Sequence, residues 1–139
     1  MTPEQIDLVE STFAVFYPQR YDEFAADFYD RLFALDPALR PLFPDDMASQ
    51  RSKLMTTFNI IINGLRHPDS LRPVLGKLGR LHVSQGVKPH DYQTVGAALI
   101  ATLAGYLGPR WSPAVAAAWA AAYATLTDLM LASPAASPQ

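Results

Sequence analysis

The sequence predicts an all-α domain, and three observations support this prediction. Apolar residues recur at helical spacing along most of the chain, alternation with period two is never sustained, and proline or glycine interrupts the pattern where helices would end. The chain has 139 residues and is 50% hydrophobic, which is enough to bury one core. We therefore expect about seven to eight helices in a single domain.

Two helices are expected in the first 35 residues. Residues 2–5 read Thr-Pro-Glu-Gln, a capping box with proline at the first helical position, and the helix they start is expected to end at Pro18. The second helix has Tyr29 beside its apolar stripe. The two stripes are Ile6, Val9, Phe13 and Phe16, and then Phe24, Phe28 and Leu32.

Proline and glycine also delimit the middle of the chain. A short helix is expected over residues 36–41, where an Asp-Pro pair starts it and a proline closes it. A longer amphipathic helix follows over residues 50–65. Asp69 or Ser70 caps the next helix, and Gly86 has the place of its left-handed terminator.

The last two helices are expected over residues 89–108 and 112–132. Together with the earlier elements they make a domain over residues 1–132, followed by a flexible tail over 133–139 that is rich in Pro, Ala and Ser. The apolar stripe of the final helix comprises Val115, Trp119, Tyr123, Leu126 and Met130.

Composition excludes several classes of function. The formal net charge is -2 and the basic residues are scattered, so bulk electrostatic binding to nucleic acid is not expected. The absence of cysteine excludes disulfides, iron–sulfur clusters and thiol catalysis, and it fits a cytoplasmic protein. The N-terminus does not read as a signal peptide, and the alanine-rich residues 114–124 fall well short of the roughly 20 needed for a membrane span.

One of the three histidines differs from the others. His67 and His90 lie in polar segments beside proline, where we expect them to be exposed, whereas His82 ends an otherwise apolar helical stripe. A buried, hydrogen-bonded histidine is one interpretation of that pattern. The other is the single protein ligand of a haem iron, because the porphyrin supplies four nitrogens and one side chain completes the site.

Several segments together resemble the globin family, most closely neuroglobin and the single-domain bacterial haemoglobins related to flavohaemoglobin. The resemblance extends from about residue 4 to 132, and its motifs occur in order at compatible spacing. They are Phe28–Phe43, Ser49–Met55, Leu78–His82 with Gly86-Val87, Val95-Gly96, Leu107–Pro109 and Ala118–Tyr123.

The resemblance implies a globin fold around a haem b group, with His82 as the proximal iron ligand. It also implies that Phe43 packs against the haem edge and that Leu54 lies over the site of the bound gas. Lys53 is expected to pair with a haem propionate; ligation of the iron and a solvent-facing position are the alternatives. The other residues expected to line the pocket are Phe58, Leu78, Leu81, Val87, Tyr92 and Val95.

Tyr29 and Gln50 match the two polar positions of the distal pocket. If buried, a phenol and an amide both need hydrogen-bond partners. A diatomic ligand that carries partial negative charge can accept from both, and each such bond is worth about 1–3 kcal/mol. We expect these two residues to stabilise the bound gas.

One departure from the family pattern affects the proximal side. Tyr92 matches a tyrosine that, in flavohaemoglobin-like globins, polarises the proximal histidine together with a glutamate. That glutamate position falls near Pro134, the chain has no Glu after Glu23, and Asp128 comes too early. An imidazole without an anionic partner releases less electron density, which argues against strong peroxidase-like chemistry.

The expected function is reversible binding of dioxygen, and of nitric oxide and carbon monoxide, at a five-coordinate iron. Nitric oxide dioxygenase activity with an external reductase is the catalytic extension of this function. A haem-based gas or redox sensor that signals through a separate partner is the alternative, and a haem-free interaction protein is a third. A monomer or weak homodimer is expected.

Overall fold

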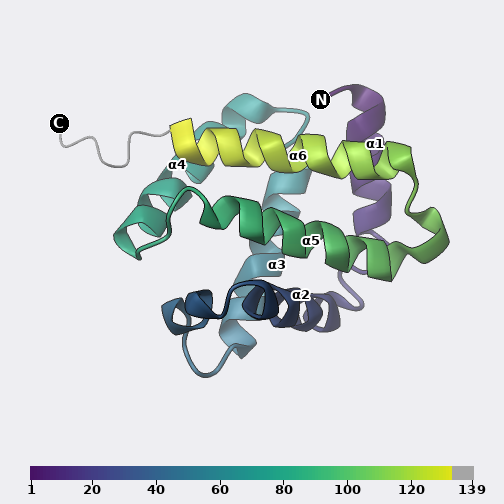
Figure 1. Cartoon of the computed structure of the whole chain (residues 1–139). Helices are drawn as coiled ribbons and strands as arrows, with labels where there is room; N and C mark the ends of the chain where they lie inside the picture. Colours follow the sequence, from purple (N-terminus) through teal and green to yellow (C-terminus); the bar gives the residue numbers. More distant parts are fainter. Residues whose placement is uncertain (133–139) are drawn as a thin grey trace.

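The computed structural model describes residues 1–132, and these residues form six α-helices and two short 3-10 helices, without strands (Figure 1). The all-α prediction is therefore confirmed. The predicted tail over 133–139 lies outside the described residues. The elements are α1 (Pro3–Phe13), α2 (Tyr21–Leu35), η1 (Pro37–Leu42), α3 (Ala48–Asn63), α4 (Pro68–Ser84), α5 (Asp91–Leu107), η2 (Gly108–Arg110) and α6 (Pro113–Ala132).

The helices pack in two linked groups. In one, α6 lies against α1 and α4; in the other, α2 lies against α5 and α3. The two groups meet where α5 and α6 run antiparallel across the molecule (Figure 1). Although consecutive in the chain, α3 and α4 are not among the pairs that pack closely, so their facing surfaces depend on other elements for burial.

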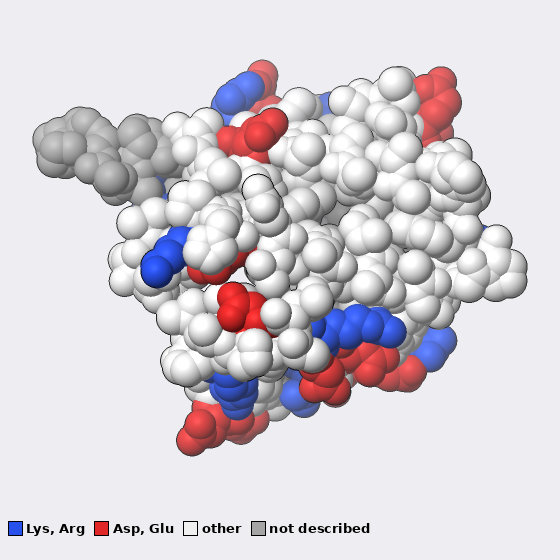
Figure 2. Space-filling view, viewed as in Figure 1, with Lys and Arg blue, Asp and Glu red and all other residues white. Residues whose placement is uncertain are grey.

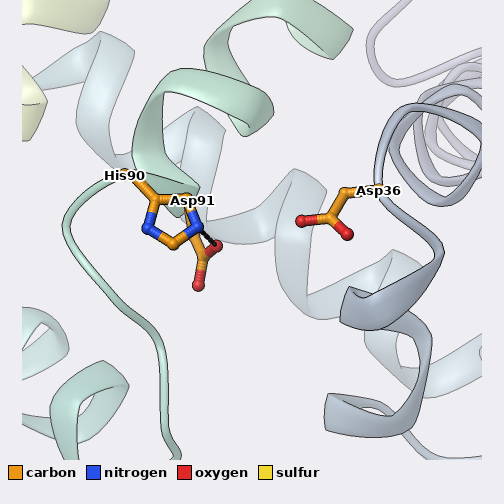
Figure 3. Close-up of side chains that lie close together, drawn as sticks. All are labelled: Asp36, His90 and Asp91. Atoms are coloured by element: carbon orange, nitrogen blue, oxygen red, sulfur yellow. Dashed lines mark ion pairs between the residues drawn. The ribbon is translucent and has the colours of Figure 1, made fainter.

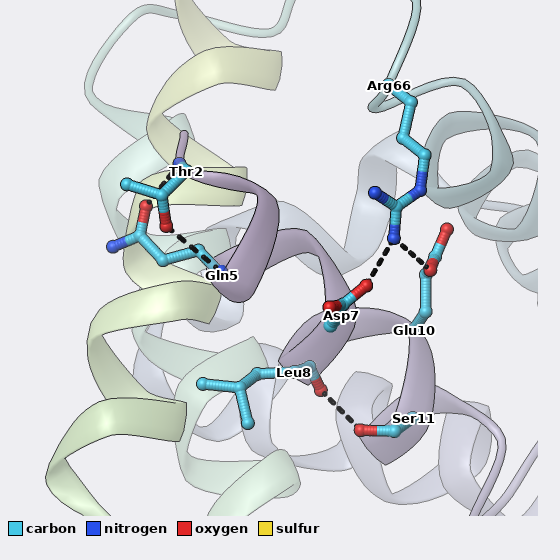
Figure 4. Close-up of polar contacts among 7 residues, drawn as sticks. All are labelled: Thr2, Gln5, Asp7, Leu8, Glu10, Ser11 and Arg66. Atoms are coloured by element: carbon cyan, nitrogen blue, oxygen red, sulfur yellow. Dashed lines mark hydrogen bonds and ion pairs between the residues drawn. The ribbon is translucent and has the colours of Figure 1, made fainter.

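The first helix begins as predicted and ends earlier. Gln5 N donates to Thr2 Oγ1 and Thr2 N donates to Gln5 Oε1, both at 3.1 Å, which confirms the capping box (Figure 4). However, α1 ends at Phe13 and the chain turns well before Pro18. Phe16 is still buried, because its ring stacks on that of Phe24 with centroids 4.0 Å apart. Burial of the apolar stripe therefore extends beyond the helix itself.

Other boundaries shift by one or two residues. The N-cap of α4 is His67, in place of the predicted Asp69 or Ser70, because Pro68 is suited to the first helical position. Gly86 follows α4 with φ of 90°, the left-handed conformation predicted for it. Asp36 caps η1 as predicted, with Ala38 N donating to its Oδ1 at 3.1 Å, and this short helix is of the 3-10 type.

Surface charges tie the turn after α3 to α1. Arg66 donates to Asp7 at 2.5 Å and to Glu10 at 2.9 Å (Figure 4). These side chains are largely exposed, so each pair adds little to stability. Much of the molecular face viewed in Figure 2 is uncharged, and several acidic and basic side chains gather along its lower edge, over α2.

Among the described residues, α6 is the one helix long and apolar enough to cross a membrane, judged by length and composition alone. In this structure Val115, Ala118, Trp119, Leu126 and Met130 of that helix are buried in the protein core. Of these residues, Trp119 donates to Thr12 of α1 and the backbone of Met130 lies against Gly79 of α4.

Candidate functional site

Several apolar side chains of α3, α4, α5 and the nearby loops are only half-buried. They pack against the core. They lie on α3 and α4, which are not among the closely packed helix pairs, and on α5 and the loops nearby. Half-exposed apolar side chains on neighbouring elements offer the kind of surface that a flat apolar ligand can cover. The group comprises Phe43, Met47, Leu54, Phe58, Leu78, Val87 and Val95.

His82 lies in the last turn of α4 and is partly buried. Its Nδ1 is 3.2 Å from the hydroxyl oxygen of Tyr92, and the two rings meet edge to face. Burial lowers the pKa of the imidazole, so the ring is neutral near pH 7. Its Nε2 has no hydrogen-bond partner among residues 1–132, and a neutral imidazole with one nitrogen oriented and the other open is suited to bind a metal.

The corner after α4 keeps this ring in place. Val87 N donates to the carbonyl oxygen of His82 at 2.9 Å, across the left-handed Gly86. Tyr92 follows at the start of α5, and its own backbone oxygen accepts from the hydroxyl of Tyr123 at 2.5 Å. Three elements thus converge on the position of one imidazole.

The hydroxyl of Tyr92 has a second neighbour that sequence reasoning missed. It lies 3.9 Å from Met130 Sδ, in α6. The predicted glutamate position near Pro134 is outside the described residues, and Asp128 is exposed. Met130 was identified only as part of an apolar stripe, and its role at Tyr92 carries no local sequence signal.

Tyr29 and Gln50, predicted as a polar pair, do come together. Gln50 Nε2 donates to the hydroxyl oxygen of Tyr29 at 3.2 Å, across the contact between α2 and α3. Tyr29 is 5% exposed, and burial raises the pKa of its phenol, so the hydroxyl keeps its proton near neutral pH. Since its oxygen already accepts from Gln50, the phenol has a hydrogen left to donate, and no described residue accepts it.

Aromatic rings surround the Tyr29 side chain. Phe43, in the loop after η1, meets it edge to face at 5.4 Å, and Phe33 stacks beside it at 5.8 Å. With these rings packed around it, the Tyr29 side chain is buried. Phe43 is therefore next to Tyr29, and its contact with the haem edge stays a prediction.

Two predicted pocket residues are not drawn into the group. Lys53 is exposed on α3 and makes no ion pair within the described part of the chain. Leu81 is 49% exposed, although it is adjacent to His82 in the sequence. One residue along a helix turns the side chain by about 100°, which places Leu81 away from the face that carries His82.

A polar cluster lies where η1 approaches the start of α5. One ligand atom each of Asp36, His90 and Asp91 lies within 4.8 Å of the others, and His90 Nε2 is 3.2 Å from Asp91 (Figure 3). Figure 2 shows the surface hollowed in this region, with acidic side chains on both sides. His90 is exposed, as predicted, whereas Asp91 is buried and accepts from Lys88 N at 2.9 Å.

Comparison with known proteins places this arrangement in a family. The globin family model matches residues 26–130. The chain belongs to the globin family. Flavohemoproteins of Deinococcus radiodurans and Rhizobium meliloti are 32% and 29% identical to it, over 94% of this globin and 33% of each relative. The chain thus spans about a third of the length of the curated relatives it matches.

The fold agrees with this assignment. A bacterial globin from Campylobacter jejuni superposes with a TM-score of 0.83, at 23% identity and over 94% of each chain. Membership of the globin family implies a haem group, and the residues of this globin fit one. The open Nε2 of His82, the spare hydrogen of Tyr29 and the half-buried apolar side chains are the features that a haem with a bound gas would use.

Proposed function

We propose that this globin holds haem b through His82 and reversibly binds dioxygen, nitric oxide and carbon monoxide on the opposite face. The observation that carries the proposal is the phenol of Tyr29, which is buried, protonated and left with one hydrogen to donate. The haem, when bound, supplies the iron that takes the gas. Every other contribution comes from side chains of the chain itself.

On the proximal side, His82 is the iron ligand and Tyr92 orients it. The contact at Nδ1 fixes which ring nitrogen faces the pocket, because a hydrogen bond at one imidazole nitrogen sets the role of the other. The lowered pKa of His82 keeps the ring free of the competing proton near pH 7. The half-buried side chains of Leu78, Val87 and Val95 supply apolar surface for the porphyrin.

On the distal side, Tyr29 donates to a gas that carries partial negative charge and Gln50 holds Tyr29 in place. The Gln50 amide donates to the phenol oxygen, so the remaining phenol hydrogen is directed away from Gln50. Leu54 and Phe58 add apolar surface on α3. A buried donor in an apolar pocket strengthens such a bond, since water does not compete for it.

Oxidation of nitric oxide by the oxygenated globin is the second candidate function, with an external reductase as electron donor. The Tyr29–Gln50 pair favours it, because a donor that slows the release of dioxygen gives nitric oxide time to react. This function is distinguished by rapid loss of the oxygenated absorption spectrum after addition of nitric oxide, with nitrate as the product.

The experiment that tests the proposal measures the dioxygen dissociation rate of the haem-loaded protein by stopped flow. Tyr29→Phe should raise that rate roughly ten- to a hundredfold, as expected for loss of a hydrogen bond of about 1.5–3 kcal/mol. Tyr21→Phe, at an exposed tyrosine on the same helix, is the matched control and should leave the rate unchanged. An unchanged rate in Tyr29→Phe, or a chain that takes no haem, contradicts the proposal.

A further inference from the structure

The proximal imidazole belongs to a chain of hydrogen bonds that ends on sulfur. His82 Nδ1 lies 3.2 Å from the Tyr92 hydroxyl, and that hydroxyl lies 3.9 Å from Met130 Sδ. Tyr92 and Met130 are 7% and 8% exposed. Within residues 1–132, no carboxylate reaches this hydroxyl, because the one acidic residue of α6, Asp128, is exposed.

Iron binding would fix the direction of this chain. A neutral imidazole that uses Nε2 as a ligand carries its proton on Nδ1, so Nδ1 donates to the Tyr92 oxygen. Among residues 1–132, the hydroxyl hydrogen of Tyr92 then has one acceptor within reach, the sulfur of Met130.

The place of the sulfur is set by the contact between α4 and α6. A Cβ at Gly79 would stand 2.3 Å from the carbonyl oxygen of Met130, so only glycine lets the two backbones come this close. Gly79 precedes His82 by one helical turn, and the side chain of Met130 is therefore held beside the same turn of α4. Tyr123 donates to the backbone oxygen of Tyr92 and so holds Tyr92, the residue that contacts the sulfur.

We propose that Met130 is a positioning residue that tunes the haem iron through Tyr92 and His82. A thioether is neutral and only a weak acceptor, so the relay gives the imidazole little anionic character. A less electron-releasing imidazole favours the ferrous state, the state that binds dioxygen, and gives the site a higher reduction potential than a carboxylate at residue 130 would. The inference rests on the proposed function, since it needs iron on His82.

The test measures two properties of the haem-loaded protein: the reduction potential of the iron and the iron–histidine stretching frequency of the ferrous form. Met130→Glu should lower the potential by at least the equivalent of a tenfold change in the reduction equilibrium, about 59 mV for one electron, and should raise the stretching frequency. Met130→Gln, a neutral but stronger acceptor, should shift both in the same direction by less. Met130→Leu, which removes the acceptor, should shift both in the opposite direction, by less than Met130→Gln does.

Two controls separate the relay from other effects. Leu131→Glu places the same charge at an exposed neighbour on α6 and should leave both readouts near the wild-type values. In a Tyr92→Phe background, Met130→Glu should no longer shift them. If Met130→Glu folds poorly, the reduction potential and stretching frequency of Met130→Gln decide whether the relay exists.

The outcomes distinguish this inference from the proposed function. A wild-type protein without a Soret band after addition of hemin fails the proposed function, and the inference fails with it. If the wild type takes up haem, and Met130→Gln and Met130→Glu have the same reduction potential and stretching frequency as the wild type, the inference alone is overturned. A shift that persists without the Tyr92 hydroxyl also overturns it, because the effect would then bypass the relay.

Discussion

The indole of Trp119 in α6 donates a hydrogen bond of 2.8 Å to the hydroxyl of Thr12 in α1. Both side chains are buried, and the Thr12 hydroxyl itself lies 2.6 Å from the carbonyl oxygen of Leu8, to which it donates. The two residues are separated by 107 positions in the chain, so this bond fixes the terminal helices against each other in the core.

Thr12→Val should destabilise the protein by about 1–3 kcal/mol, because an apolar side chain of the same shape leaves the buried indole N–H without an acceptor. Urea unfolding followed by circular dichroism measures the change. Thr12→Ser retains the hydroxyl and should recover most of the loss. Equal stabilities of the valine and serine variants would show that this bond contributes nothing.

Gly79→Ala should destabilise the protein, although alanine is the better helix former. The new Cβ would lie 2.3 Å from the Met130 carbonyl oxygen, and moving two helix backbones apart costs about 1–3 kcal/mol. Gly105→Ala on α5 is the matched control: its Cβ would come no closer than 3.4 Å, to the flexible end of Arg31, and should stabilise by up to about 1 kcal/mol. The difference in the free energy of unfolding between the two variants is the decisive quantity.

His82→Gly should abolish the Soret band of the hemin-treated protein while the helical circular dichroism remains. The side chain is only partly buried, so its removal leaves most of the core intact. Free imidazole added to the variant should restore haem binding, because it can occupy the space left by the side chain. His67→Gly, at an exposed histidine, should bind haem as the wild type does. Normal haem uptake by His82→Gly without imidazole would remove His82 as the ligand.

The raised pKa of the buried Tyr123 phenol predicts that the protein loses stability at alkaline pH. Burial raises the pKa of its phenol to about 12, so the folded state retains this proton at a pH where the unfolded chain has lost it. The stabilisation is complete below the ordinary tyrosine pKa of about 10 and is lost as the pH rises from there through about 12.

Tyr123→Phe should flatten this dependence. The variant also loses the hydrogen bond to the Tyr92 backbone, so it should be less stable by about 1 kcal/mol at pH 7. Between pH 10 and 12 its stability should fall less steeply than that of the wild type, as measured by urea unfolding of the apoprotein. Parallel curves for the two proteins over this range would contradict the prediction.

The apolar stripes and turn residues predicted the architecture well. The capping box at Thr2 and the left-handed Gly86 occur as predicted. The last helix begins where expected, with Ser112 Oγ accepting from Val115 N at 3.2 Å. Helix ends were less accurate: α1 stops at Phe13 because the chain turns there while Phe16 still reaches the core. The pattern marks which residues are buried better than it marks where a helix ends.

The residues of the site were predicted better than the contacts between them. His82 could be identified because it is the one polar residue at the end of an apolar stripe, and family resemblance indicated Tyr29 and Gln50. Their pairing depends on how α2 crosses α3, and the contact of Tyr92 with Met130 depends on how closely α6 approaches α4. No residue near Met130 in the sequence signals that approach.

The sequence by itself determined the helices, the caps at Thr2 and Asp36 and the histidine that ends an apolar face. These features depend on residues within about four positions of each other, so they can be recognised in short stretches of the sequence. Only the tertiary structure decided that Gln50 meets Tyr29, that Trp119 meets Thr12 and that a sulfur lies beside Tyr92. Those contacts follow from helix crossing and register, which the packing of the whole core sets at once.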